Sequence, residues 1–231
     1  MPLSNQQIVG LGGACDSDEQ TRLLLRHVLG LTGKANPSVL FVPTALGDSS
    51  EGITRFYELY AGLGDLSHTR FFPYPPPDLR ESVLGRDAIC ISGGNTANML
   101  AVWRVHGFGA LLREAWEAGV LLFGASAGMI CWFEAGVTDS FGPELEGLRD
   151  GLGFLAGSAC PHYDGEPRRR PRYRELVAAG FPDGLAADDG VALHFVGTEL
   201  HEVISCRAGA AAYRVTRAGE ERLEPRLLGP S

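Results

Sequence analysis

Ser126 stands at the centre of segment 124–128 (GASAG), which fits the pattern G-x-S-x-G. An apolar run precedes the segment, and the residues after it are typical of a helix. This pattern between a strand and a helix is the nucleophile elbow, in which a sharp turn exposes a serine hydroxyl at the carboxyl edge of a sheet. Small neighbours let the helix pack close to the strand. We therefore predict that Ser126 is a nucleophile, with the amide of Ala127 beside the oxyanion that its attack creates.

A serine hydroxyl needs a general base at neutral pH, and histidine is the usual one. His162 follows an expected strand at 158–160 and enters a polar loop, the place where parallel α/β sheets gather functional groups. It is our preferred base. His27, His68 and His106 are assigned to the surface or the core, while His194 and His201, in or near late strands, stay open as alternatives.

The five cysteines are widely spaced and never form C-x-x-C, a pattern that indicates neither a zinc cluster nor a disulfide framework. We expect reduced, mostly buried thiols, and we assign Cys131, five positions after Ser126, to the core. No metal and no cofactor are expected.

Composition narrows the class of protein. The 231 residues, 45% of them apolar, are enough for one domain with a sizeable core, so we expect a single domain over 1–231. A formal net charge of −8 argues against nucleic acid or an anionic membrane as a partner. No leader-like segment and no long apolar run are present, which predicts a cytoplasmic protein. Assembly into a homodimer is left open.

The elements that must position Ser126 alternate along the chain. Apolar or β-branched runs and helical periodicity predict an α/β fold, with a mostly parallel central sheet covered by helices on both faces. The expected strands are 7–11, 38–42, 69–74, 87–92 and 120–123, and the expected helices are 18–29, 53–63, 96–105, 110–118 and 126–133. Closely spaced later strands predict an antiparallel extension of this sheet, at 158–160, 191–195, 203–205 and 212–216. We expect disorder from about residue 219.

Three segments together carry a resemblance: 92–96 (SGGNT), 124–128 (GASAG) and 161–163 (PHY). Their order and spacing over residues 7–215 resemble the peptidase E family of serine peptidases. The resemblance implies a cytoplasmic α/β protein with a fold similar to class I glutamine amidotransferases. The family includes dipeptidases that release an N-terminal aspartate and cyanophycinases that cut a branched aspartate-arginine polymer.

The resemblance also assigns roles. It makes Ser126 the nucleophile and His162 the base, and it places Gly93 and Gly94 with the amide of Ala127 in an oxyanion hole. These assignments agree with the chemistry read from the residues themselves.

The acid of the triad has two candidates. Aspartyl dipeptidases place it after the nucleophile helix, which corresponds to Asp139, and cyanophycinases place a glutamate before a later strand, which corresponds to Asp189. We favour Asp189, at the head of a strand expected beside the His162 strand.

Substrate binding is assigned to Arg169 and Asn95. Arg169 lies in a run of five arginines within 168–174, and guanidinium groups grip carboxylates bidentately. The predicted activity is hydrolysis of short peptides, in particular dipeptides with an N-terminal aspartate, through an acyl-enzyme. A cyanophycinase-like or isoaspartyl peptidase and a non-catalytic binding protein on the same fold are the alternatives.

Overall fold

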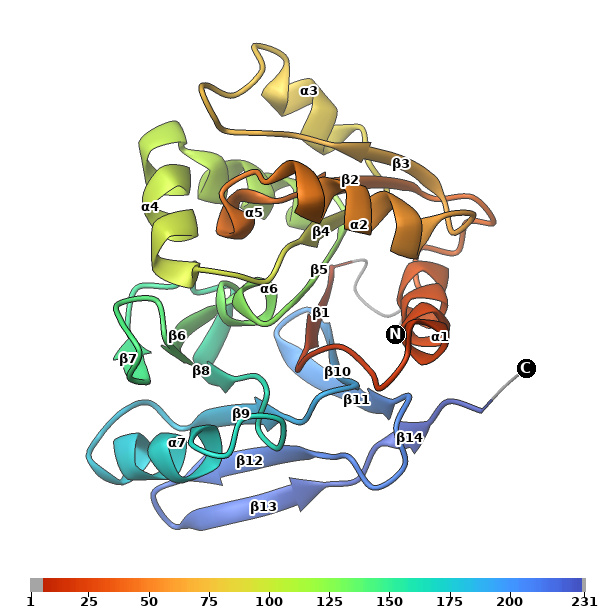
Figure 1. The fold of residues 1–231 in the computed structure, drawn as a ribbon. Coiled ribbons are helices and arrows are strands. Elements are labelled where there is room, and N and C mark those ends of the chain that lie inside the picture. The colour runs from red at the N-terminus through yellow and green to blue at the C-terminus, as the bar shows by residue number, and fades with distance from the viewer. Residues whose placement is uncertain (1–5, 230–231) are drawn as a thin grey trace.

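The computed structural model describes residues 6–229 and contains two sheets with helices packed around them (Figure 1). The first sheet has eight strands in the order β14-β11-β10-β1-β5-β4-β2-β3. Strands β1 to β5 within it are parallel, whereas β10 pairs antiparallel with both β1 and β11. The bounds are β1 (Gln7–Leu11), β2 (Ser38–Val42), β3 (Asp65–His68), β4 (Ala88–Ile91), β5 (Leu121–Ala125), β10 (Val191–Val196), β11 (Glu199–Ser205) and β14 (Arg226–Leu227).

The second sheet has six strands in the order β13-β12-β9-β8-β6-β7. Its central strands β6, β8 and β9 are parallel, and the outer pairings are antiparallel. Figure 1 shows its strands β12 and β13, in blue, at the end of the molecule opposite α3. The bounds are β6 (Phe133–Thr138), β7 (Glu146–Leu148), β8 (Leu155–Cys160), β9 (Gly184–Ala187), β12 (Ala212–Thr216) and β13 (Gly219–Leu223).

Helices cover both faces of the first sheet because alternate strand residues are apolar on each side. In β4, Ala88 and Cys90 pack towards one core with α1 and α2, and Ile89 and Ile91 pack towards another with α4, α5 and α6. Helix α7 packs on the second sheet through a third core. The bounds are α1 (Asp18–Gly30), η1 (Thr44–Leu46, a short 3-10 turn), α2 (Ser50–Tyr60), α3 (Leu79–Leu84), α4 (Thr96–His106), α5 (Phe108–Glu117), α6 (Ala127–Ile130) and α7 (Arg169–Ala178).

The predicted α/β class, with a parallel sheet covered on both faces, is confirmed, but the later strands differ from expectation. Only β10, β11 and the short β14 extend the first sheet; the strands at 158–160 and 212–216 belong to a second sheet. The prediction of disorder from about 219 was wrong, because β13 pairs with β12 and β14 pairs with β11. The expected helix 126–133 is one turn long, since β6 begins at Phe133. The expected strand at 69–74 is replaced by β3, which ends at His68.

None of the helices within residues 6–229 combines the length and the apolar character needed to cross a membrane.

Candidate catalytic site

Ser126 occupies a strained turn directly after β5. Its backbone has φ 58° and ψ −113°, a conformation that residues with a side chain rarely adopt. A hydrogen bond to β1 holds the turn in place: the amide of Ser126 donates to the carbonyl oxygen of Leu11 at 3.1 Å. Backbone strain of this kind persists only where the surrounding structure enforces it, and such residues cluster at functional sites.

The glycines on either side of Ser126 are required by close packing. A Cβ added to Gly124 would lie 2.8 Å from the Cα of Gly128, and one added to Gly128 would lie 2.4 Å from the carbonyl oxygen of Ile91. Both distances are too short for real atoms, so larger residues would push α6 away from β4 and β5. The small residues of segment 124–128 therefore allow the sharp turn that exposes Ser126.

His162 is positioned by the same end of β1. It follows β8, has φ 53°, and its amide donates to the carbonyl oxygen of Gly12 at 2.9 Å. The amides of Ser126 and His162 thus bond to the consecutive carbonyls of Leu11 and Gly12. One short stretch of backbone at the carboxyl end of β1 carries both residues, at the sheet edge where α/β proteins place their sites.

Asp189 is the carboxylate that contacts His162. The distance from Asp189 Oδ1 to His162 Nδ1 is 2.6 Å, and the two side chains are about one quarter exposed, 25% and 24%. When Nδ1 donates its proton to this carboxylate, Nε2 carries the free lone pair that can accept a proton. In that tautomer the carboxylate of Asp189 leaves Nε2 of His162 free to act as a base.

The pairing of Asp189 with His162 arises from a strand that the sequence did not predict. The expected neighbour strand, β10, lies in the first sheet beside β1. Instead, β9 runs parallel to β8, with Cys160 opposite Ala186, so the carboxyl ends of both strands meet. Asp189 stands in the turn from β9 to β10, where the chain passes from the second sheet to the first.

Two glycines make room for the carboxylate of Asp189. A Cβ on Gly13 would lie 1.8 Å from Asp189 Oδ1 and 2.7 Å from His162 Nδ1, and a Cβ on Gly165 would lie 2.0 Å from Asp189 Oδ2. Neither glycine belongs to a motif that could have been recognised in the sequence. In the folded chain the backbone at Gly13, in the loop after β1, lies directly against the hydrogen bond between His162 and Asp189.

Asp164 supports the Asp189 turn from its outer side. Its Oδ1 accepts a hydrogen bond from the amide of Asp189 at 2.9 Å, and its Oδ2 forms an ion pair with Arg207. Arg207 also lies 3.6 Å from the carboxylate of Asp16. The contact of Asp164 with the Asp189 turn joins residues 25 positions apart, so local sequence carried no signal for it.

The predicted oxyanion residues lie beside Ser126. A Cβ on Gly93 would be 3.4 Å from Ser126 Cβ and 4.0 Å from Ser126 Oγ, so the loop after β4 borders the nucleophile. Gly94 has φ 124° and packs on η1, where a Cβ would meet the carbonyl oxygen of Ala45 at 2.2 Å. Ala127 is the first residue of α6, whose amide has no partner within the helix. Their role in binding an oxyanion stays a prediction.

Asn95 contacts Ser140, the residue after Asp139, and among residues 6–229 no hydrogen bond joins Asn95 or Asp139 to the His162–Asp189 pair. Asp139 is exposed after β6, and within residues 6–229 no hydrogen bond joins it to His162. The side chain of Asn95 caps α4 by accepting from the amide of Asn98 at 2.8 Å, and its Nδ2 donates to the carbonyl oxygen of Ser140 at 2.9 Å.

Arg169 is buried, with 3% of its side chain exposed. Its guanidinium bonds to the carboxylate of Glu166 at 2.7 Å and to the carbonyl oxygen of Val137 at 3.1 Å. A substrate carboxylate would have to compete with both partners.

The other candidate bases and thiols have structural surroundings. His194 is buried in β10 and bonds to Gln7 Oε1 through Nε2 at 2.9 Å; burial, with a smaller contribution from nearby His201, lowers the pKa of His194 to about 4. Burial likewise raises the pKa of the Cys131 thiol well above its usual value, so this cysteine carries no thiolate at neutral pH. Neither residue contacts the His162–Asp189 pair.

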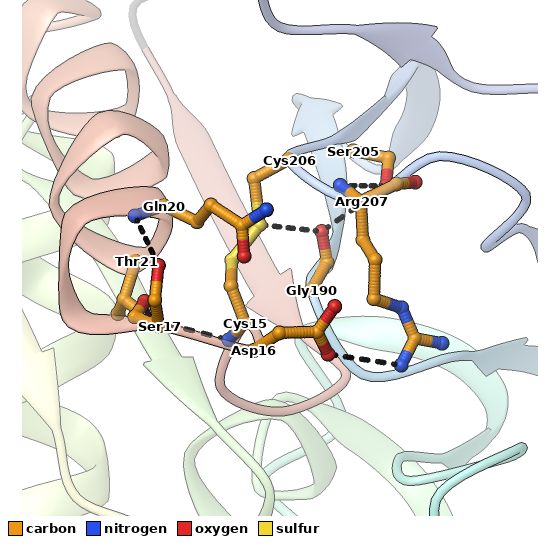
Figure 2. Close-up of a disulfide and its surroundings, with 9 residues drawn as sticks. All are labelled: Cys15, Asp16, Ser17, Gln20, Thr21, Gly190, Ser205, Cys206 and Arg207. Carbon is orange, nitrogen blue, oxygen red and sulfur yellow. Dashed lines mark hydrogen bonds and ion pairs between the residues drawn. A yellow bond between two sulfur atoms is a disulfide. The ribbon is translucent and has the colours of Figure 1, made fainter.

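A disulfide between Cys15 and Cys206 overturns the prediction that all thiols are reduced. Figure 2 shows it beside Gly190, the residue after Asp189, with Arg207 reaching towards Asp16. The amide of Cys206 donates to the carbonyl oxygen of Gly190 at 3.1 Å. Spacing could not reveal this pair, because the cysteines are 191 positions apart and meet only when β1 and β11 enter one sheet. The remaining three, Cys90, Cys131 and Cys160, are free and buried.

We expect the variant with both Cys15→Ser and Cys206→Ser to lose about 2–5 kcal/mol of unfolding free energy, since a cross-link over a long loop restricts the unfolded chain. Urea unfolding with and without a phosphine reductant measures this loss. The reductant should destabilise the unmodified protein and leave the double variant unchanged. Equal midpoints for the unmodified protein in both conditions would contradict the prediction.

Within the described part of the chain, no group of three or more His, Cys, Asp or Glu side chains is placed to hold a metal ion.

The chain is similar in sequence to known peptidases. Residues 8–203 match the family model described as Peptidase family S51. The chain is 47% identical over 222 residues to a protein of Bacillus subtilis (strain 168) named "Uncharacterized peptidase YgaJ", covering 95% of this chain and 96% of that protein.

Two solved structures have a similar fold. A peptidase from an acI-B1 actinobacterium aligns with a TM-score of 0.65 at 17% identity, over 96% of this chain and 95% of that one. A putative peptidase E protein from Listeria monocytogenes EGD-e aligns with a TM-score of 0.62 at 18% identity, over 95% and 99%. At such identities the likeness concerns the fold alone.

Proposed function

The chain belongs to peptidase family S51, and from that premise we propose that it is a serine peptidase that cleaves short peptides through Ser126, His162 and Asp189. The observation that carries the proposal is the 2.6 Å contact between His162 Nδ1 and Asp189 Oδ1. The amides of Ser126 and His162 bond to the consecutive residues Leu11 and Gly12 at the end of β1. A nucleophile, a base and an orienting acid are the parts that acyl transfer by serine requires.

In the proposed reaction, Ser126 Oγ attacks the peptide carbonyl while His162 Nε2 takes the hydroxyl proton. The oxyanion is stabilised by amides of Gly93 or Gly94 and Ala127. The C–N bond then breaks, and His162 returns the proton to the departing amine. Water repeats the sequence on the acyl-enzyme and releases the acid product. Asp189 stabilises the imidazolium that forms in each half of the reaction.

The preference for an N-terminal aspartate rests on the resemblance, with Arg169 and Asn95 as its binding residues. Arg169 is bonded to Glu166 and Val137. The side-chain amide of Asn95 uses both its nitrogen and its oxygen in hydrogen bonds within the protein. A substrate aspartate would bind there only by displacing Glu166 from Arg169. The aspartate preference therefore rests on the resemblance alone, and these contacts do not favour it. The cytoplasmic location stays a prediction from the sequence.

A branched or isoaspartyl peptide is the second candidate substrate. It is favoured by the identity of the acid, since Asp189 stands where the resemblance places the cyanophycinase acid, before β10. Comparing α-linked with β-linked aspartyl dipeptides separates the two substrate classes.

Labelling by a fluorophosphonate tests whether the site is catalytic at all. We expect the unmodified protein to be labelled on Ser126, because the reagent needs an activated serine. Ser126→Ala should abolish labelling, while the matched change Ser67→Ala, in strand β3, should leave it unchanged. An unlabelled native protein would favour the non-catalytic binding protein instead.

A further inference from the structure

An apolar cavity of about 210 Å³ lies beside the nucleophile turn, between α2 and the carboxyl ends of β1, β2, β4 and β5. Its interior is formed largely by the aromatic side chains of Phe41, Phe56 and Tyr60. Leu46, 41% exposed, and the exposed Arg55 also line it, so the cavity reaches the surface. We call this space the α2 cavity.

The α2 cavity shares two wall residues with the catalytic site. The first is Ala125, which precedes Ser126 in the chain. The second is Gly93, which is so close to Ser126 that a Cβ added to Gly93 would lie 3.4 Å from Ser126 Cβ. Among the described residues that line it, neither His162 nor Asp189 occurs. The cavity wall therefore includes the residue before the serine and part of the loop after β4, and its described lining does not include the His162–Asp189 pair.

The two halves of a peptide substrate occupy different places relative to Ser126 and His162. The departing amine must lie near His162, because His162 returns the proton to it. The residue whose carbonyl is attacked stays on Ser126 and beside Gly93. Of the two halves, it is this acyl residue that stands at Ser126, next to Ala125 and Gly93 of the cavity wall.

The cavity has the size and chemistry for an apolar side chain. A cavity of about 150 Å³ lined by apolar residues already binds benzene, so the larger α2 cavity can hold the side chain of leucine, methionine or phenylalanine. Arg55, the charged residue at the rim, is paired with Asp18. A carboxylate entering the interior would lose its water without gaining a cation, which is strongly unfavourable.

The cavity wall also contains a serine hydroxyl that has no hydrogen-bond partner among the described residues. Ser92 is 5% exposed, lines the cavity, and its Oγ has no hydrogen-bond partner among residues 6–229. Because this oxygen atom is itself fully covered, it adds almost no polar surface to the cavity.

We infer that the α2 cavity receives the side chain of the residue whose carbonyl Ser126 attacks, and that the protein prefers peptides with leucine, methionine or phenylalanine at this position. The inference rests on the proposed function, because it assumes acyl transfer to Ser126. It names a substrate class different from the aspartyl peptides that the resemblance implies.

Two dipeptide series test the inference. In X-Ala peptides, where X supplies the attacked carbonyl, we expect kcat/KM for Leu or Phe to exceed that for Ala by about 10–200-fold, the range for apolar groups filling a pocket. Asp and Lys should be poorer than Ala. The Ala-X series should vary little. A flat X-Ala series or a best rate with Asp-Ala would overturn the inference, and a preference confined to the Ala-X series would move the side chain to the departing half.

Aminoalkyl phosphonate diphenyl esters provide a test that needs no peptide turnover. Ser126 Oγ forms a bond to phosphorus, phenol leaves with the serine proton, and only the acyl-side chain varies. Esters with Leu or Phe side chains should inactivate the protein faster than those with Asp or Lys. If fluorophosphonate labels Ser126 but these esters react at equal rates, the inference fails while the proposed function stands; if nothing labels Ser126, both fail.

Variants of the cavity wall complete the test. Leu59→Trp, from α2 into the cavity, should reduce the Phe-over-Ala ratio about tenfold or more, while Ala-Ala hydrolysis is retained. Leu46→Ala, at the rim, should weaken the same preference without blocking entry. Tyr57→Trp, on the same helix but outside the cavity lining, is the matched control. Unchanged ratios in both wall variants, with unchanged melting temperatures, would contradict the inference.

Discussion

Ser126→Ala is expected to lower kcat by about 10⁶-fold, as removal of the serine does in other triads, while the protein stays folded. Alanine fits the turn, because its neighbours are already small and the strained backbone is held through the amide of Ser126 and the carbonyl of Leu11. Hydrolysis of a dipeptide that the native protein cleaves, measured with purified variant and with circular dichroism to verify folding, checks this result.

The companion change His162→Ala should be as damaging, and the double variant should be no worse than either single one, because the two residues act as one unit. Peptide hydrolysis that survives in Ser126→Ala would disprove the assignment of the nucleophile. If His194→Ala or His201→Ala were the crippling change, the base would be wrongly placed.

Asp189→Asn is expected to lower kcat by about 10⁴-fold with little change in KM, the effect of replacing the triad acid elsewhere. Asparagine has nearly the same shape but no charge, so it cannot stabilise the imidazolium and can hold His162 in the wrong tautomer. Asp139→Asn, at an exposed position away from the His162–Asp189 contact, should cause a much smaller loss.

Steady-state kinetics on the two aspartate variants side by side decides the acid. Each is the matched control of the other, since both exchange a carboxylate for an amide. An inactive Asp139 variant together with an active Asp189 variant would reverse the assignment. A fall in kcat/KM caused only by a higher KM would instead indicate that Asp189 binds substrate.

The sequence by itself determined the features that depend on neighbouring residues. The turn at Ser126 needs small residues within two positions of the serine, and these are adjacent in the chain, so the segment GASAG was sufficient to predict it. The parallel strands β1, β2, β4 and β5 are short apolar runs, and their burial on both faces makes them visible in the sequence. The α/β class followed from the same periodicity.

Features that depend on distant residues were decided only by the tertiary structure. Strand β9 (GLAA) has a weak strand signal and exists because it pairs with β8 and β12, yet it is this pairing that brings Asp189 to His162. The second sheet, the disulfide over 191 positions and the α2 cavity likewise combine segments that are distant from one another in the sequence. Local propensity is a property of a few consecutive residues, whereas strand pairing and cavity walls are set by the packing of the whole chain.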